Sequence, residues 1–264
     1  MTAFRNPLNP INSINLMNLT VKPSRRRLDA LLVERGLAQS RQRALALILA
    51  GKVYIDGERI TKAGSLLPVN CAIKITGRDI PYVSRGGTKL EAAIRAFNVD
   101  VTGLTCLDVG ASTGGFTDCL LKHGAKHVTA VDVGYGQLHW KLRSDPRVKV
   151  IERTNIRHLD AGAMPGRVDL ACIDVSFISL KIVVPAVLKF VKRPGHIICL
   201  VKPQFEVGKG LVGKGGVVRD PDLHKAVMDD LSGAFQGLNL RVLGVIPSPI
   251  LGPKGNQEFL MYLQ

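Results

Sequence analysis

The sequence predicts an α/β protein in which a small α+β domain precedes a larger, doubly wound α/β domain. Strand-like and helix-like runs alternate from residue 105 to the C-terminus, which is typical of a doubly wound sheet. A glycine-rich turn, residues 110–115, follows the first of these strand-like runs. A separate basic stretch, residues 25–62, passes from helical to strand-like patterning well before that alternation begins.

Composition favours a polyanionic partner. The 264 residues are 46% apolar and carry a formal net charge of +15. Clustered Lys and Arg displace the counterions condensed on nucleic acid and so drive association. A merely basic surface, or one that binds anionic membranes, is the alternative. No apolar stretch approaches the roughly 18 residues needed to span a bilayer, so we expect a soluble protein without a membrane partner.

The cysteines and histidines favour a reducing compartment and no metal. The five cysteines are odd in number, lack a C-x-x-C pair and mostly lie in apolar runs, which predicts buried thiols. The six histidines are scattered without metal-ligand spacing. We therefore expect a cytoplasmic protein that binds no metal.

Residues 1–24 form a leader in which Asn and Pro recur and only Arg5 and Lys22 are charged. This composition predicts a disordered segment. Its lack of acidic residues is shared with organelle transit segments, but its three prolines disfavour an amphipathic helix. Met17 is a second candidate for the start of translation.

The first predicted domain covers residues 25–77. Leucines at helical spacing from Leu28 predict a short helix that stops at Gly36. Ser40 is an N-cap candidate for a second helix over residues 41–50, and Gly51 stands just beyond its end. Short strands are expected at residues 53–55, around Ile60 and at residues 73–75, with a turn at residues 56–57.

Positive charge gathers where these helices start. Residues 25–62 hold nine Lys or Arg against four Asp or Glu, and five of the nine precede a predicted helix or lie in its first turn. Cations there oppose the helix dipole, an arrangement that phosphates at the helix N-termini would offset. A solvated charged face is the alternative.

This stretch resembles the small RNA-binding domain named after ribosomal protein S-four. The resemblance lies in Arg27-Leu-Asp29, residues 32–36, Ser40-Arg41, Gly51-Lys-Val53 and Asp56-Gly57. It implies an S-four-like RNA-binding domain. Its candidates for RNA contact are Arg25, Arg26, Arg27, Arg41, Arg43, Lys52, Arg59 and Lys62. Arg85, in the following linker, is a further candidate.

Residues 78–87 combine Pro, Ser and paired Gly in a polar run, which predicts a linker before a second domain over residues 88–264. Helices are expected at residues 88–97, 117–122, 183–191 and 223–235. Strands are expected at residues 105–109, 128–131, 148–151, 168–173, 196–201, 240–246 and 258–263, the last of them antiparallel. Ligands of such sheets bind at the carboxyl ends of the strands.

The glycine-rich turn lies where the first of these strands meets its helix, a place where close approach of the backbone to a nucleotide requires glycine. Its pattern, G-x-S-x-x-G, fails the dinucleotide fingerprint, which disfavours NAD and FAD. Asp132, 24 residues after Asp108, ends the second predicted strand and is placed to accept hydrogen bonds from ribose hydroxyls. A turn that serves only packing is the alternative.

The turn resembles the first motif of methyltransferases that use S-adenosylmethionine. The resemblance implies a Rossmann-like class I methyltransferase domain with S-adenosyl-L-methionine as cofactor. Its candidate contacts are Asp108, Gly110, Ala111, Ser112, Thr113, Gly114, Gly115, Phe116, Asp132 and Asp174. A competing motif, residues 208–214, matches the start of a P-loop, but Gly215 replaces the Ser or Thr that binds Mg²⁺. We interpret residues 206–218 as a mobile lid.

Four charged residues, Lys89, Asp174, Lys202 and Glu258, stand at edges of predicted strands or helices. For each of these residues taken singly, an ordinary charged residue on the surface is the alternative. A ribose 2′-hydroxyl is a weak acid, so its attack on a sulfonium methyl needs positioning and a proton acceptor or cationic stabiliser. Lys202, between a strand and Pro203, is placed for that role. Phe116 and Phe177 are candidates to stack on a splayed base, with core packing as the alternative.

The whole of residues 25–264 resembles the TlyA family, historically labelled haemolysins, which joins an S-four-like domain to an FtsJ-like methyltransferase domain. The family's Lys-Asp-Lys-Glu set matches the four charged residues. The resemblance implies S-adenosylmethionine-dependent 2′-O-methylation of a cytidine in ribosomal RNA, by a monomer that acts on RNA or a ribosomal subunit. Short family members act on large-subunit RNA and longer ones also on small-subunit RNA. This chain has features of both forms, and we expect it to act on large-subunit RNA.

Two other functions remain open at this point. A non-catalytic RNA-binding ribosome-assembly factor would share the basic first domain. A membrane-active haemolysin would need a bilayer-length or strongly amphipathic apolar segment, and the sequence offers none.

Overall fold

The computed structural model describes residues 24–38, 40–76, 81–208 and 210–264. The chain divides into two compact units, residues 1–79 and 80–264, which are described separately. Residues 1–23 of the predicted leader and residues 78–80 of the predicted linker lie outside the described residues.

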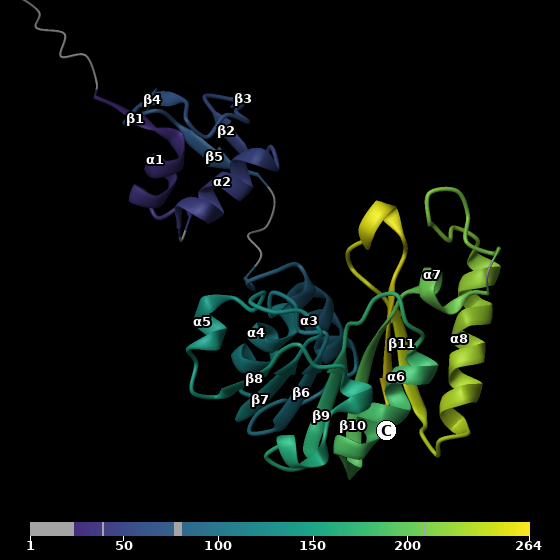
Figure 1. Ribbon diagram of the computed structural model, residues 1–264. Coiled ribbons are helices and arrows are strands. Elements are labelled where there is room, and N and C mark those ends of the chain that lie inside the picture. The colour runs from purple at the N-terminus through teal and green to yellow at the C-terminus, as the bar shows by residue number, and fades with distance from the viewer. Residues whose placement is uncertain (1–23, 39, 77–80, 209) are drawn as a thin grey trace, which may run out of the picture. The chain divides into compact units, whose positions relative to one another are not determined.

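The smaller unit contains two short helices and two small antiparallel sheets (Figure 1). Its helices are α1 (Leu28–Glu34) and α2 (Arg41–Leu49). One sheet pairs β1 (Arg25–Arg27) with β4 (Leu66–Pro68); the other orders β3 (Glu58–Arg59), β2 (Val53–Ile55) and β5 (Ile73–Ile75). The Ser40 hydroxyl accepts a hydrogen bond from the Arg43 backbone N–H and caps α2 as predicted.

Two strands of this unit were not predicted. The arginines 25–27 were expected to lead into the first helix, but they form β1, paired in antiparallel register with β4. All three are exposed, so the strand lacks the alternation of apolar and polar residues that reveals a strand in a sequence. Leu28, directly after β1, is fully buried and begins the core that α1 and α2 share.

The larger unit is built on a seven-stranded sheet in the order β11-β12-β10-β9-β6-β7-β8. Within the described residues, β12 alone runs opposite to the other six strands of this sheet, which confirms the antiparallel last strand. The strands are β6 (Thr105–Val109), β7 (His127–Val131), β8 (Val148–Ile151), β9 (Val168–Ile173), β10 (Val191–Val201), β11 (Val242–Pro247) and β12 (Phe259–Leu263).

Helices cover both faces of this sheet (Figure 1). Alternate strand residues supply the two apolar layers: Leu107 and Ile173 pack with α6 (Leu180–Val187) and α8 (Pro221–Gln236), while Cys106 and Cys172 pack with α3 (Gly86–Ala96) and α4 (Gly115–Lys122). Such alternation follows from the two-residue period of a strand. All five cysteines are buried free thiols, as expected.

The prediction was wrong in detail around residue 190. The helix expected at residues 183–191 is α6, which ends at Val187, and a 3₁₀ turn, Leu188–Phe190, follows it. The next strand, β10, begins at Val191, five residues earlier than expected, and is irregular between Val191 and His196. An apolar run rich in valine fits a helix or a buried strand equally well, so periodicity alone did not place this boundary. The short helices α5 (Trp140–Arg143) and α7 (Pro203–Glu206) were also missed.

The sheet order places several predicted site residues together. Counted outward from β6, one half of the sheet runs through β7 and β8 and the other through β9 and β10, so the order reverses between β6 and β9. Ligands of doubly wound sheets bind at the carboxyl edge beside such a switch point. Gly110 follows β6, Asp174 follows β9 and Lys202 follows β10 at this edge.

Candidate active site

A pocket of about 630 Å³ opens at this carboxyl edge, a volume in the range of small-molecule sites. Six segments of the larger unit form its wall: the start of α3, the glycine-rich turn, the loop after β9, the residues after β10, the loop around Gly216 and the loop before β12. The wall includes Arg85, Lys89, Gly110, Ala111, Ser112, Thr113, Gly115, Phe116, Asp174, Ser176, Phe177, Lys202, Gln204, Phe205, Gly216, Gly252, Asn256 and Glu258.

The glycines of the turn are required by contacts within the protein. Gly110 has φ +83°, and a Cβ there would lie 2.3 Å from the Asp174 carbonyl oxygen. At Gly115 a Cβ would lie 2.3 Å from the Ser84 hydroxyl oxygen. Packing therefore accounts for these glycines, yet the turn still lines the pocket, except for Gly114, which caps α4 in a left-handed conformation. The turn can thus present its backbone to a ligand.

Asp108 supports the turn from behind the pocket wall. It is fully buried and is not among the lining residues. Its Oδ2 accepts hydrogen bonds from the backbone N–H and the hydroxyl of Thr117, in the first turn of α4, at 2.9 and 2.6 Å. Burial raises the pKa of Asp108 to about 7, with the charges of Asp174 and Asp132 adding to the effect and the Thr117 hydrogen bonds opposing it.

Asp132 ties the turn to the loop after β7. Its Oδ2 accepts from the Ser112 backbone N–H and its Oδ1 from the Gly134 backbone N–H, both at 2.7 Å. Each carboxylate oxygen can accept a second hydrogen bond. Asp132 does not line the pocket itself, but it follows β7 directly beside the Ser112 portion of the pocket wall.

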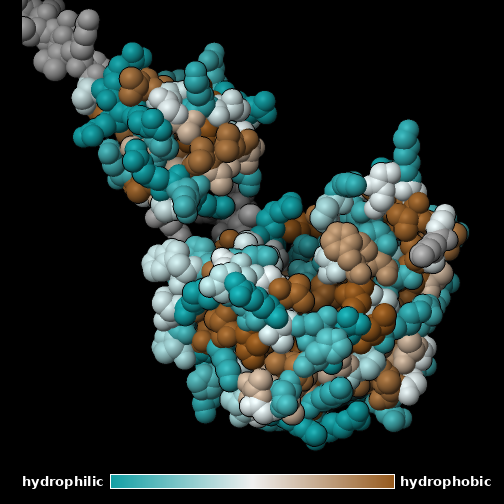
Figure 2. Space-filling model, in the orientation of Figure 1, coloured by the Kyte–Doolittle hydropathy of each residue, from teal (hydrophilic) through white to brown (hydrophobic). Residues whose placement is uncertain are grey.

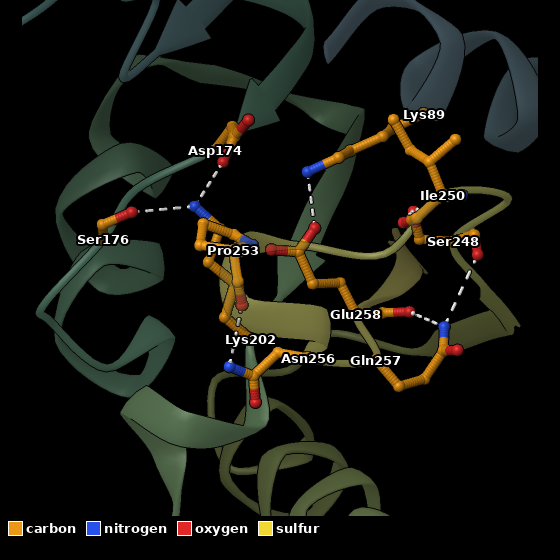
Figure 3. Close-up of polar contacts among 10 residues, drawn as sticks. All are labelled: Lys89, Asp174, Ser176, Lys202, Ser248, Ile250, Pro253, Asn256, Gln257 and Glu258. Carbon is orange, nitrogen blue, oxygen red and sulfur yellow. Dashed lines mark hydrogen bonds and ion pairs between the residues drawn. The ribbon is translucent and has the colours of Figure 1, made fainter. Parts of the chain in front are cut away.

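Lys202 and Asp174 form the first of two ion pairs in the pocket wall (Figure 3). The Lys202 Nζ lies 2.6 Å from Asp174 Oδ1 and donates a hydrogen bond to the Ser176 hydroxyl at 3.0 Å. The Lys202 side chain is only 10% exposed. Its place directly after β10, before the Pro203 that starts α7, directs it into this wall.

Lys89 and Glu258 form the second pair, 2.5 Å apart between Nζ and Oε2 (Figure 3). Lys89 lies in the first turns of α3, and Glu258 directly precedes β12. The Glu258 side chain is fully buried, and its Oε1 has no hydrogen-bond partner among the described residues. Gly252 leaves the space that this carboxylate occupies, because a Cβ there would lie 2.2 Å from Oε1.

The structure thus brings all four predicted charged residues to one pocket, as two lysine–carboxylate pairs. Partly buried pairs are screened less than surface pairs and so hold their geometry more firmly. Such a site can orient a hydroxyl, hold positive charge beside a developing negative charge, and accept a proton at an amine.

The two phenylalanines singled out in the sequence differ in solvent exposure. Phe116 is 3% exposed and packs in the core behind the turn. Phe177 is 89% exposed, has a left-handed backbone with φ +63°, and its ring centroid lies 4.9 Å from that of Phe205. A non-glycine residue in this conformation is uncommon and is often found at functional sites.

Ser176, Gln204 and Asn256 are among the pocket residues that were not predicted as site residues. Ser176 stands two residues after Asp174, a spacing that could have indicated a shared direction at a strand end. Asn256 accepts from the Val218 backbone N–H and donates to the Gly216 and Pro253 carbonyls. It therefore connects the predicted lid to the loop before Glu258, a contact between distant segments that no local signal announces.

The predicted lid, residues 206–218, includes Gly216 in the pocket wall, while residue 209 lies outside the described residues. Its first residue is anchored: Glu206 accepts hydrogen bonds from the Ser179 hydroxyl at 2.6 Å and the Leu180 backbone N–H at 2.9 Å. Burial raises the pKa of Glu206. The mobility of this segment stays a prediction.

The RNA-contact candidates of the smaller unit lie on its surface. The face shown in Figure 2 is largely hydrophilic, with apolar side chains gathered in its middle. Asp29 pairs with Arg27 at 3.0 Å and with Arg41 at 3.8 Å, which holds two candidates together at the start of the helices. Arg85 belongs to the larger unit, where it is the N-cap residue of α3 and lines the pocket.

Within the described part of the chain, no helix combines the length and apolar character needed to cross a membrane. In the same residues, no group of three or more His, Cys, Asp or Glu side chains is arranged to hold a metal ion.

The sheet order, with its single antiparallel strand and a ligand pocket at the switch point, defines a Rossmann-like methyltransferase domain, and a small basic unit precedes it. The family model described as FtsJ-like methyltransferase matches residues 82–264, and the S4 domain model matches residues 26–70. The chain belongs to the TlyA family of FtsJ-like methyltransferases, as the following relatives show.

The "16S/23S rRNA (cytidine-2'-O)-methyltransferase TlyA" of Mycobacterium tuberculosis is 52% identical over 91% of this chain and 90% of its own length. The "23S rRNA (cytidine-2'-O)-methyltransferase TlyA" of Campylobacter jejuni is 32% identical over 87% of this chain and 96% of its own. A solved structure from Streptococcus thermophilus that carries a haemolysin name has a TM-score of 0.72 and 42% identity, covering 92% of this chain and 89% of that one.

Proposed function

We propose that this protein transfers the methyl group of S-adenosyl-L-methionine to the ribose 2′-hydroxyl of a cytidine in large-subunit ribosomal RNA. The observation that carries the proposal is the Lys202–Asp174 pair, 2.6 Å apart, in the wall of a pocket that the glycine-rich turn also lines. The large subunit is the substrate common to the names of both TlyA relatives. Methylation of small-subunit RNA is the second possibility, and mapping of ribose methylation in both ribosomal RNAs would detect it.

The residues present fit S-adenosylmethionine. The turn over residues 110–113 presents backbone without large side chains at the pocket wall. Asp132, held by Ser112 and Gly134, keeps acceptor capacity for ribose hydroxyls on both carboxylate oxygens. When bound, the cofactor supplies an electrophilic sulfonium methyl group. We assign residues 110–116, Asp132 and Asp174 to its binding, with Asp108 as a support of the turn.

We assign to Lys202 the role of accepting the proton of the 2′-hydroxyl. Methyl transfer would form the bond between O2′ and the methyl carbon as the carbon–sulfur bond breaks and leaves a neutral thioether, and the hydroxyl proton must then leave O2′. In its unprotonated form Lys202 Nζ accepts that proton, and Asp174 stabilises the ammonium that results. Lys89, held by Glu258, places a second positive charge in the wall to orient the ribose and its phosphates.

The exposed ring of Phe177 supplies a stacking surface for the target base. Sequence-specific recognition of RNA often splays a base out and stacks it on an aromatic side chain. Phe177 lines the pocket and contacts Phe205, so a base stacked there would keep its ribose near Lys202.

The smaller unit serves to dock the RNA. Its arginines and lysines, Arg25, Arg26, Arg27, Arg41, Arg43, Lys52, Arg59 and Lys62, would contact phosphates. Arg85 would continue this contact at the pocket. We propose that the protein acts as a monomer, and a ribosomal substrate implies action in the cytoplasm.

Mass mapping of ribose methylation in ribosomal RNA, from cells with and without the gene, tests the proposal. We expect one cytidine 2′-O-methyl group of large-subunit RNA to disappear with the gene and to return with the wild-type gene but not with a Lys202→Ala copy. Unchanged maps would refute the proposal and favour a non-catalytic assembly factor. Release of dye from lipid vesicles by the purified protein would instead support a membrane-active haemolysin.

A further inference from the structure

The amine of Lys202 is held at two points by the loop after β9. Its Nζ lies 2.6 Å from Asp174 Oδ1 and 3.0 Å from Ser176 Oγ (Figure 3). Among the described residues, no other acceptor contacts this nitrogen. A neutral amine carries two N–H groups and one lone pair. If the two N–H groups point to Asp174 and Ser176, the lone pair is left for the pocket that Lys202 lines.

These two acceptors stand on a loop that is anchored at both ends. At its start, the Asp174 backbone N–H donates to the Val109 carbonyl at 2.9 Å, and Gly110 packs against the Asp174 backbone. At its end, Ser179 caps α6 and donates its hydroxyl to Glu206. Between these anchors Val175 packs on the core, so Asp174 and Ser176, on either side of it, both face Lys202.

One acceptor alone would not fix this direction. A lysine side chain has four rotatable bonds, and a single ion pair sets a distance but leaves the amine free to rotate about the line that joins the two charges. Lys89 illustrates the difference, since its Nζ contacts only Glu258 among the described side chains. The second contact is therefore what distinguishes the lysine placed to accept a proton.

We propose that Ser176 is a positioning residue, which together with Asp174 aims the lone pair of Lys202 at the substrate hydroxyl; this inference rests on the proposed methyl transfer. Ser176 itself is exposed toward the pocket, and its hydroxyl donates to no described residue. Its contribution is to the geometry of proton transfer, to which reaction rates are sensitive because an error of about 1 Å can cost about 100-fold.

The kinetic test compares Ser176→Ala with Ser176→Thr, which keeps the hydroxyl. Ser232→Ala is the matched control, because it removes a serine hydroxyl that bonds to the Met228 carbonyl on α8, outside the pocket wall. We expect kcat of Ser176→Ala to fall about 10- to 100-fold while KM for RNA and for S-adenosylmethionine change less than about twofold. Ser176→Thr is expected to keep most of the rate, and the control all of it.

A spectroscopic test does not depend on turnover. In protein labelled with 15N-lysine, the side-chain Nζ signal of Lys202 is identified as the signal that Lys202→Ala removes. We expect this signal to shift and its protons to exchange faster with water in Ser176→Ala but not in Ser176→Thr. An unchanged signal in Ser176→Ala, or equal kinetic losses in the Ala and Thr variants, would overturn the positioning role.

The two proposals fail in different ways. If Lys202→Ala methylates RNA at the wild-type rate, the role of Lys202 in the proposed function is wrong, and the role of Ser176 fails with it. If Lys202→Ala is inactive while Ser176→Ala keeps full kcat, only the inference about Ser176 is overturned.

Discussion

Lys89 Nζ and Glu258 Oε2 meet at 2.5 Å although 169 residues separate them in the chain. Their pairing joins the first helix of the larger unit to the residue that precedes its last strand. A pocket assembled in this way depends on the complete sheet, because Glu258 directly precedes β12, which lies between β10 and β11. The pair is therefore part of the site and also stabilises the fold.

The first prediction concerns the contribution of this ion pair to stability. Glu258→Gln leaves the Lys89 ammonium, only 12% exposed, without its counter-charge. We expect a loss of about 2–4 kcal/mol in the free energy of unfolding, because breaking a buried pair strands the remaining charge. The double variant Lys89→Met, Glu258→Gln removes both charges and is expected to be more stable than Glu258→Gln alone. Urea denaturation measures both, and a double variant that is less stable than the single would contradict this account.

The second prediction concerns Lys202. Lys202→Ala removes the proton acceptor, and we expect the transfer of labelled methyl groups to RNA to fall at least about 100-fold, in the range that general base catalysis contributes. RNA affinity should persist, because all the residues assigned to docking except Arg85 lie on the smaller unit. Filter binding measures that affinity under the same conditions. Wild-type methylation by this variant would refute the assigned role.

The sequence predicted the main features of the fold and site, and its failures have physical reasons. The set of four charged residues was predictable from the resemblance to the TlyA family, and Asp174, Lys202 and the turn also follow parallel strands, whose carboxyl ends meet at one edge of the sheet. Ser176 and Asn256 were missed, since their partners, Lys202 and Val218, are distant in sequence. The strand β1 was missed because three exposed arginines show no period. Contacts with Asp174 and Ser84 account for Gly110 and Gly115, in keeping with the packing alternative, and a role of the glycines toward the cofactor stays a prediction.

The third prediction tests whether the turn serves the cofactor. Gly110→Ala would bring a Cβ to 2.3 Å from the Asp174 carbonyl oxygen and push the turn and the β9 loop apart. We expect S-adenosylmethionine affinity, measured by calorimetry, to fall at least about tenfold. Gly103→Ala is the control, since it also has a positive φ, +76°, but meets no atom within 4 Å. Equal affinity in both variants would show that the contact at Gly110 does not shape the cofactor site.

The fourth prediction concerns pH and Asp108. Because its pKa is raised in the folded protein to about 7, the folded state binds the proton more tightly than the unfolded state, whose pKa is about 3.9. Stability from this group is therefore present below about pH 4 and is lost as the pH rises to about 7, by up to about 1.4 kcal/mol per pH unit. Asp108→Asn cannot ionise, so the difference in unfolding free energy between wild type and variant should change across this window. A difference that is constant from pH 4 to pH 7 would contradict the raised pKa.

The fifth prediction concerns docking. Arg41→Ala with Arg43→Ala removes two cations from the first turn of α2, where Arg41 lies near Asp29. Each phosphate contact that is lost should reduce the slope of log affinity against log salt by about 1, because fewer counterions are released on binding. We expect weaker RNA binding with a shallower salt dependence, at unchanged affinity for S-adenosylmethionine, since the cofactor pocket belongs to the larger unit. Lys126→Ala, which removes a cation from the larger unit outside the pocket wall, controls for net charge. If both changes lower the salt slope equally per charge removed, the effect is one of overall charge and the docking role of α2 is wrong.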